Sequence, residues 1–201
     1  MKRFILLFCL ALSTITMSAQ TYWDNSRPDH RLTFGVRAGV NFSKTIEKEL
    51  DMSYCFGYQG GVALDINIIQ SLSIGTGLTY IRKGYKMELE FAKDYVTKYT
   101  THVGYIEMPL FLSYRVKLSD SSRFQFNGGT YFAYGIESNN NSYFAKNRGM
   151  KRFDAGLLLG IAVTYNQFLA GVNYERGLYN INKTGDKTNN GCIAISLGYN
   201  F

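Results

Sequence analysis

The amino-acid sequence predicts an all-β fold: an eight-stranded antiparallel barrel of up-and-down topology that crosses a membrane. Three observations predict it: eight segments alternate between apolar and small or polar residues, their connections alternate in length, and aromatic residues mark both ends of the apolar faces. The chain has 201 residues, 46% of them hydrophobic and 18% charged, which is too apolar for a disordered polymer. After the first 20 residues, no apolar run reaches the roughly 18 residues that a transmembrane helix needs.

The first 19 residues have the pattern of a secretory signal peptide. Lys2 and Arg3 precede the apolar run 4–12, and the small residues Ser18 and Ala19 precede the expected cleavage point. We therefore expect residues 1–19 to be removed, residues 20–31 to form a periplasmic segment and residues 32–201 to form the barrel. Loss of Lys2 and Arg3 changes the formal charge from +7 to +5, because 20 basic residues then face 15 acidic ones. The expected location is a bacterial outer membrane.

The alternation is clearest in the first expected strand, 32–43, where even positions are apolar and odd positions are small or polar. The other expected strands are 54–66, 72–80, 106–116, 124–136, 153–164, 168–175 and 193–201. Links at 67–71, 117–122 and 166–167 are short and the others are long, as periplasmic turns and extracellular loops are. Because Pro109 cannot donate a backbone hydrogen bond, we expect a bulge in its strand.

Side-chain size decides which face of each strand points outward. The apolar face carries most of the Phe and Tyr residues, whereas the opposite face is rich in Gly, Ala and Ser. A soluble sandwich would bury the large residues and expose the glycines and charges. In a barrel of eight strands the large residues face lipid and the small ones fill a narrow lumen.

Four stretches carry a resemblance to a known family: 35–42 (GVRAGVNF), 73–86 (SIGTGLTYIRKGYK), 105–112 (YIEMPLFL) and 191–201 (GCIAISLGYNF). With the signal peptide, they make the sequence resemble the PorT-like outer-membrane β-barrel family of Bacteroidota. The resemblance implies the barrel fold and the outer-membrane location, and it gives a precedent for a part in protein secretion. The terminal Tyr199 and Phe201 look like the signal read by the barrel-assembly machinery, which is therefore an expected partner.

Charged residues with inward parity predict a polar network in the lumen, because buried charges must find partners. Asp65 and Arg115 both lie near the short-turn end, while Arg37 lies at a depth near Glu107 and Glu175. We expect the network to fill the barrel and make it rigid. A pair of carboxylates acting as a glycosidase-type acid and base, or a proton path, are the alternatives. The expected lumen network is Arg37, Asp65, Glu107, Arg115, Asp154 and Glu175.

A projecting hairpin is predicted between the third and fourth strands. The alternation inverts at Gly84 and inverts back at Gly104, and both lie equally far from Asp94, so we expect a tip near Asp94 and a β-bulge in each arm. The arm 72–91 is about twice as long as the roughly 9 to 11 residues that span a membrane. Its exposed strand edges invite pairing with another chain. The expected interaction face is Tyr85, Met87, Leu89, Phe91, Tyr95 and Tyr99.

Cysteine and histidine positions argue against a disulfide and a metal site. Cys55 and Cys192 lie on strands separated by one other strand, and two strand spacings of roughly 9.5 Å exceed the Cα separation of a disulfide. We expect free thiols. No CxxC motif or Cys and His cluster is present, so we expect no metal and no other cofactor.

The sequence favours a non-enzymatic docking or interaction module of the cell envelope, which either anchors a surface or secretion complex or binds an external ligand. A narrow porin-like solute channel is the alternative. An enzyme is a lesser alternative, because only His102 is placed for catalysis at the rim, with Asp94, Asp51 or Ser53 as conceivable partners. Basic residues outnumber acidic ones in the long loops, so outer-membrane lipid, including lipopolysaccharide, is an expected partner and nucleic acid is not.

Overall fold

The computed structural model describes residues 24–46, 53–92, 95–140, 143–144, 149–183 and 188–201, and the expected signal peptide lies outside these ranges. Within them the chain forms eight strands and no helix that could span a membrane. The strands are β1 (Leu32–Ile46), β2 (Ser53–Ile69), β3 (Leu72–Ala92), β4 (Tyr95–Lys117), β5 (Ser122–Ser138), β6 (Phe153–Tyr165), β7 (Phe168–Gly177) and β8 (Asn189–Asn200).

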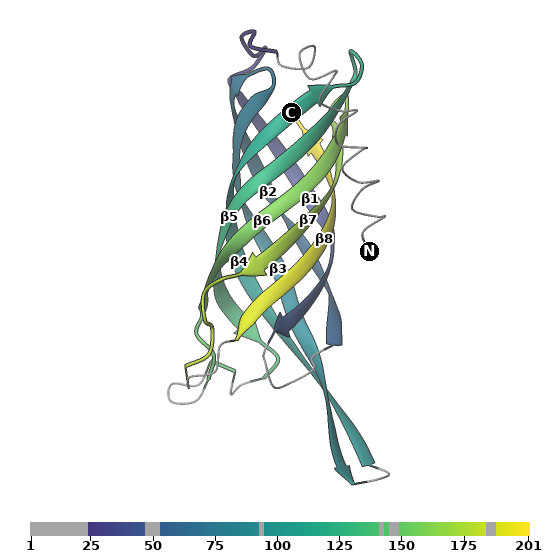
Figure 1. Ribbon diagram of the computed structural model, residues 1–201, viewed down its shortest axis with the longest axis vertical. Coiled ribbons are helices and arrows are strands. Elements are labelled where there is room, and N and C mark those ends of the chain that lie inside the picture. Colours follow the sequence, from purple (N-terminus) through teal and green to yellow (C-terminus); the bar gives the residue numbers. More distant parts are fainter. Residues whose placement is uncertain (1–23, 47–52, 93–94, 141–142, 145–148, 184–187) are drawn as a thin grey trace, which may run out of the picture.

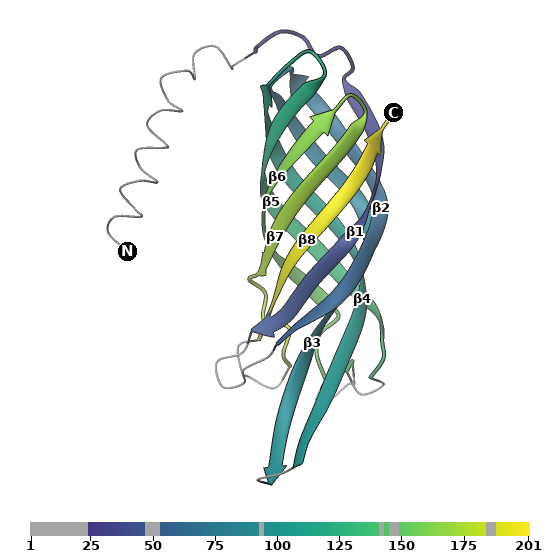
Figure 2. The same cartoon turned by 90° about the vertical axis from the view of Figure 1, so that its right-hand side faces the viewer.

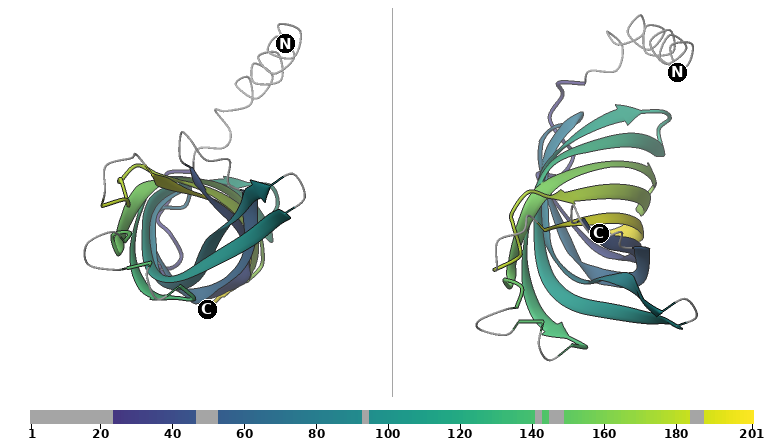
Figure 3. Two further views of the ribbon diagram at one scale, coloured as in Figure 1. Left: turned by 90° about the horizontal axis from the view of Figure 1, so that it is seen from below. Right: turned by 60° about the horizontal axis from the view of Figure 1, so that its bottom comes forward.

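The strands form a closed antiparallel barrel in sequence order (Figures 1 and 2). Each strand pairs with the next, and β8 closes on β1 from Gly35↔Asn200 to Ile46↔Asn189. The view along the barrel shows the closed ring (Figure 3, left). Closure gives the backbone groups of the spanning strands partners within the sheet, which a bilayer interior demands. The predicted fold class is confirmed.

The two faces of the barrel follow the alternation in the sequence. Phe34, Leu159 and Leu197 on the outer face expose 58%, 62% and 67% of their surface, values that suit contact with lipid and not with water. Tyr131 and Ile81 on the inner face are 0% exposed. Tyr131, which has inward parity in the sequence, is among the largest buried side chains of the described lumen.

The projecting hairpin is present, but its two arms lack the predicted bulges. From Leu72↔Tyr114 to Glu90↔Val96 the paired residues of β3 and β4 keep one register, and Gly84 lies directly opposite His102. The extra residues are on the neighbouring strands: β2 gains one between Tyr54 and Gln59, and β5 gains one between Gly135 and Glu137. The prediction found the height of the irregularities and assigned them to the wrong strands.

The inversion of the apolar pattern therefore has another cause than a bulge in the hairpin itself. Ile81, Lys83 and Tyr85 all point toward the barrel interior side, as an unbroken strand requires. On the barrel side of Gly84 the outer surface meets lipid and must be apolar. Toward the hairpin tip the outer surface meets water. The apolar residues consequently change faces while the backbone continues without a break.

Pro109 also lacks the predicted bulge. The pairs Thr76↔Leu110 and Thr79↔Glu107 share one register, and the ladder omits only the two pairs between them. Thr76 Oγ1 donates a hydrogen bond to Pro109 O at 2.9 Å. The strand thus accommodates the missing N–H by a local gap in the β3 ladder, while Pro109 still aligns with Tyr131 on β5.

The end of the barrel opposite the hairpin carries the C-terminus, the start of β1 and the short connections (Figure 1). Residues 24–31 run along the link between β2 and β3, where Asn67 N donates to Arg31 O at 2.8 Å and Gln70 N donates to Ser26 O at 3.2 Å. Asn166 in the β6–β7 turn has a φ of 51°. These contacts fix the short-turn end of the barrel, which is the periplasmic end in outer-membrane barrels of this architecture.

Candidate functional site

The part of the lumen nearest the hairpin is filled by an ion-pair cluster centred on Lys83. Lys83 Nζ lies 2.7 Å from Glu107 Oε2 and 2.8 Å from Glu175 Oε2, so β3 links β4 to β7 across the barrel. All three side chains are buried. Three charges removed from water in this way are stable only because they satisfy one another.

Aromatic rings close the lumen around this cluster. Lys83 Nζ lies 4.4 Å from the centre of the Tyr131 ring and 5.9 Å from that of Tyr105, distances that allow a cation–π interaction. Tyr131 Oη donates to Asp154 Oδ2 at 3.2 Å, and Asn190 Nδ2 donates to the same oxygen at 2.8 Å. The surrounding buried apolar cluster is Ile81, Val103, Tyr105, Tyr131, Ala133, Tyr143, Cys192 and Ala194.

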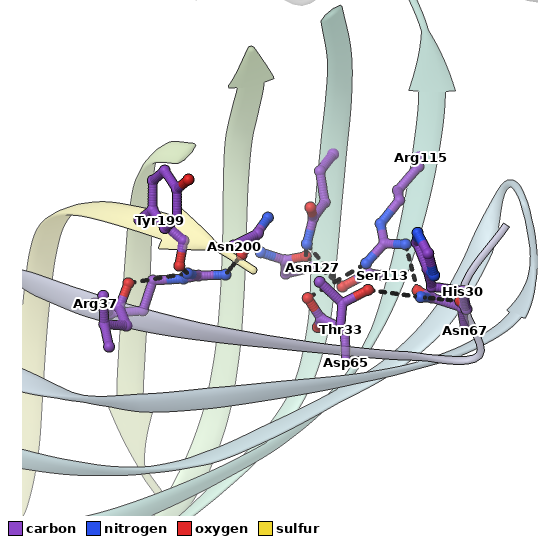
Figure 4. Close-up of polar contacts among 12 residues, drawn as sticks. His30, Thr33, Arg37, Asp65, Asn67, Ser113, Arg115, Asn127, Tyr199 and Asn200 are labelled. Atoms are coloured by element: carbon purple, nitrogen blue, oxygen red, sulfur yellow. Dashed lines mark hydrogen bonds and ion pairs between the residues drawn. The ribbon is translucent and has the colours of Figure 1, made fainter. Parts of the chain in front are cut away.

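A second polar layer lies near the periplasmic end (Figure 4). Arg115 Nη2 lies 3.4 Å from Asp65 Oδ2, and Arg115 Nη1 donates to Asn67 Oδ1 at 2.5 Å. On β5, Gln125 Nε2 donates to Ser113 Oγ at 2.9 Å. These contacts join β2, β4 and β5 from the inside.

Arg37 lines the lumen but does not pair with Glu107 or Glu175. Its guanidinium turns toward the chain end, where Nη2 donates to Asn200 Oδ1 at 2.6 Å and Nη1 donates to Tyr199 O at 3.3 Å (Figure 4). The absence of a side chain at Gly198 makes room, because a Cβ there would lie 2.4 Å from Arg37 Cδ. Arg37 thus has the inward position that its parity predicted, but its partners lie at the end of β8 and not at Glu107 or Glu175.

Between the two layers the lumen holds a cavity of about 100 Å³, lined by residues that include Arg37, Asp65, Phe111 and Glu107. The Phe111 ring lies against Gly75, where a Cβ would come within 2.3 Å of it. Another cavity of about 300 Å³ opens at the periplasmic mouth. On the hairpin side of the 100 Å³ cavity, the side chains of Lys83, Tyr105 and Tyr131 pack together inside the lumen.

Of the six residues predicted for the lumen network, the structure joins Asp65 to Arg115 and links Glu107 to Glu175 through Lys83. Asp154 is held by uncharged partners, Tyr131 and Asn190. Lys83 was missed because it stands where the apolar pattern inverts. Its odd position in the third strand, in step with Ile81, was the signal that could have found it.

The predicted interaction face of the hairpin divides between two environments. Tyr85 packs against the buried apolar cluster, and Met87 is half-buried. Tyr99 is 51% exposed. The side chains of Leu89, Phe91 and Tyr95 and the tip at Asp94 lie outside the described part of the structure.

The root of the hairpin is fixed to its neighbours. Ser43 Oγ on β1 accepts a hydrogen bond from Gly84 N at 2.7 Å and donates to Gly84 O at 3.2 Å, reaching past β2. On the other side, Asn139 Oδ1 accepts from His102 N at 2.8 Å and Asn139 Nδ2 donates to Thr100 O at 3.1 Å. Sequence reasoning gave no signal for these contacts, because they depend on the neighbouring bulges.

The C-terminal aromatics lie on the outer face at the periplasmic end. The rings of Tyr199 and Phe201 are 5.3 Å apart, and Tyr199 is also 5.3 Å from Phe168. Tyr199 Oη donates to Gln167 Oε1 at 2.6 Å, and Phe201 N donates to Phe34 O at 2.8 Å. These contacts hold the end of β8 against β1 and the β6–β7 turn.

The two cysteines in the described part of the chain, Cys55 and Cys192, are free, as predicted. Cys55 on β2 and Cys192 on β8 both pair with Ser43 on the strand between them, so they are separated by two strand spacings. We expect both thiols to react with maleimide after unfolding without a reductant. Mass spectrometry of the labelled chain checks this, and a product with no added label would contradict it.

His102 has a different neighbour from those that the sequence suggested. Its Nδ1 lies 3.6 Å from Cys55 Sγ, and the thiol is buried. A buried thiol is a poor nucleophile. Of the other suggested partners, Asp94 and Asp51 lie outside the described residues.

Comparison with known proteins identifies the architecture. A family model described as an outer membrane protein beta-barrel domain matches residues 18–183. OprG of Pseudomonas aeruginosa aligns with a TM-score of 0.52 at 12% identity, covering 89% of this chain and 99% of OprG. Neisserial surface protein A gives 0.48 at 13% identity over 84% and 97% of the two chains, and Ail of Yersinia pestis gives 0.42 at 11% over 86% and 100%. Identities this low compare folds alone. No curated protein matches the sequence.

Proposed function

The chain belongs to the outer membrane protein β-barrel domain family, and from this premise we propose that it is a non-enzymatic docking module whose projecting hairpin binds a protein partner at the cell surface. It is an outer-membrane barrel of eight strands. The length of the hairpin carries the proposal, since β3 and β4 have 21 and 23 residues whereas the other strands have 10 to 17. Figures 1 and 2 show it standing clear of the barrel.

The projecting part of the hairpin offers two strand edges. β2 pairs with β3 only as far as Lys86, and β5 pairs with β4 only as far as Val103. Beyond these residues, β3 and β4 pair only with each other among the described strands. Free edges of this kind bind extended peptides by adding a strand, and backbone hydrogen bonds supply the affinity.

The fixed root of the hairpin supports the same role. Ser43 holds Gly84 from one side, and Asn139 holds the backbone of His102 from the other. A binding edge that is already ordered loses less conformational entropy when a partner pairs with it. The barrel then serves as the anchor, and the resemblance to PorT-like proteins favours a secretion or surface complex as the setting.

A photo-reactive amino acid at position 99 in intact cells tests the proposal, with the same group at Leu118 in the β4–β5 turn as the matched control. We expect a discrete protein adduct from position 99 and none of the same mass from position 118. Both residues are exposed, at opposite ends of the barrel. Adducts only with lipopolysaccharide or with the chain's own loops would contradict the proposal.

A shortened hairpin gives the second readout. Lys86 and Thr100 are paired, so an Asn-Gly turn between them closes the hairpin without disturbing the register below. We expect this variant to fold and to lose the partner in co-purification from membranes. Unchanged recovery of the same partner with the shortened chain would mean that the hairpin is not the docking element.

A further inference from the structure

Three bases gather on the outer face of the hairpin root. Arg82 and Lys86 lie two positions on either side of Gly84 in β3, so their side chains leave the same face of the strand. His102 on β4 is paired with Gly84 and thus stands between them.

Gly84 is what lets the imidazole occupy this central position. A Cβ at residue 84 would lie 3.2 Å from His102 Nδ1 and 2.3 Å from Thr101 O. With no side chain there, the ring lies over the β3 backbone between the two cations. Arg82, Lys86 and His102 together form a basic cluster.

The basic cluster has no counter-ion among the described side chains. Neither Arg82 nor Lys86 forms an ion pair with a described carboxylate, and the sulfur of Cys55 is the side-chain contact of His102. The neighbouring carboxylate, Glu137, accepts a hydrogen bond from Tyr80 Oη. Two cations that share no carboxylate are open to an external anion.

The height of the basic cluster indicates the source of that anion. The Arg82 guanidinium lies 5.8 Å from the centre of the Tyr58 ring, and the Tyr58 and Tyr80 rings are 6.0 Å apart. On the adjacent strand Lys44 Nζ lies 4.9 Å from the centre of the Tyr54 ring. Aromatic bands of this kind lie at the level of the lipid headgroups. Cations that rest on their outer edge therefore lie at the level of lipid phosphates.

We propose that the basic cluster binds a phosphate group of an outer-leaflet lipid headgroup, of the phosphorylated glycolipid type. Arg82 and Lys86 supply charge-assisted hydrogen bonds, and His102 adds a third contact between them. The adjoining apolar and aromatic surface, which includes Tyr54 and Tyr58, accommodates the part of the same lipid next to its headgroup. This site is independent of the edge pairing proposed for the hairpin tip.

The titration of His102 gives the site a spectroscopic signature. Burial, and then Arg82 and Lys86, hold the pKa of His102 below its ordinary value of 6.5. Lys44 is the other described base of this surface, and Glu137 and Cys55 are its further titratable neighbours. A bound phosphate adds negative charge beside the ring and raises its pKa.

Native mass spectrometry of the full mature chain in detergent tests the proposal, with lipid A and its dephosphorylated form as the probes. We expect the phosphorylated form to be retained in preference. The double substitution Arg82→Gln and Lys86→Gln should weaken that preference by about tenfold or more, as the loss of two cations at a lipid surface implies. The control substitutions Lys117→Gln and Arg123→Gln, at the periplasmic end, should leave the preference unchanged.

Proton titration of His102 by NMR gives a readout that does not depend on retention. Phosphorylated lipid should raise the pKa of His102, while the ring of His30 at the periplasmic end should not respond to it. Equal retention of both lipid forms by the unmodified chain, or an undiminished preference in the folded double variant, would overturn the proposal. A response of His102 to inorganic phosphate as strong as that to the lipid would overturn the assignment to a lipid headgroup.

Discussion

Replacing Lys83 with Met is expected to lower the free energy of unfolding by about 3 to 5 kcal/mol, because Glu107 and Glu175 would share a buried site without their cation. Lys83 Nζ contacts both carboxylates within 2.8 Å, and all three side chains are buried. Met has a similar length, so the packing against Tyr131 and Tyr105 changes little. The loss is therefore expected to come from the charges.

The urea dependence of unfolding in detergent micelles, followed by tyrosine fluorescence and gel mobility, measures this effect. Adding Glu107→Gln and Glu175→Gln to Lys83→Met should restore most of the stability, because no unpaired charge then stays buried. Lys117→Met is the control: its ion pair with Asp120 is exposed, and we expect a change of about 0.5 kcal/mol or less. A Lys83→Met protein as stable as the unmodified one would contradict the ion-pair account of the lumen.

Replacing Tyr131 with Ala is expected to cost about 3 to 5 kcal/mol, as other large buried aromatic residues do when truncated to Ala. The ring is fully buried between Lys83 and the apolar cluster, so its removal leaves a cavity in the lumen. The same unfolding experiment measures the loss, and Tyr134→Ala on the lipid-facing side of β5 is the matched comparison.

The conservative change Tyr131→Phe separates packing from hydrogen bonding. It removes only the bond from Tyr131 Oη to Asp154 Oδ2, which keeps its bond from Asn190. We expect a loss of about 1 kcal/mol. If Tyr131→Phe were as damaging as Tyr131→Ala, the hydrogen bond and not the ring would be the main contribution to closure.

The sequence predicted the barrel well because membrane and lumen impose opposite demands on alternate residues. Every even position of the first strand faces outward and every odd position faces inward, so a period of two suffices to assign faces. The separation of Cys55 from Cys192 followed from strand order alone, and both pair with Ser43. Features that depend on residue parity and strand order can therefore be predicted from the sequence.

The partners of individual charges were less predictable, because parity gives the face of a residue and not its height in a tilted barrel. Arg37 has the inward parity expected of it, yet its long side chain reaches Asn200 at the chain end. Lys83 reaches from the root of the hairpin to Glu107, although the residue paired with Glu107 is Thr79. Long flexible side chains span several residues of strand, which strand alignment alone cannot resolve.

The hairpin shows a third limit of sequence reasoning. An inverted apolar pattern has two physical causes, a bulge or a change of surroundings from lipid to water, and the sequence does not distinguish them. In β3 the second cause applies, since Gly84 pairs with His102 in the same register as the residues below. As a result Tyr85 packs against the buried apolar cluster, whereas Tyr99, another member of the predicted interaction face, is exposed.

The central claim is that this barrel is a closed anchor whose working surface lies outside the lumen. Conductance of the refolded chain in planar lipid bilayers tests it most directly, with the unmodified protein and the shortened hairpin measured side by side. The Lys83 cluster predicts no steady current from either protein, because the hairpin beyond Lys86 is not what closes the lumen. Reproducible single-channel steps from the unmodified protein would contradict the claim and make a solute channel the better account.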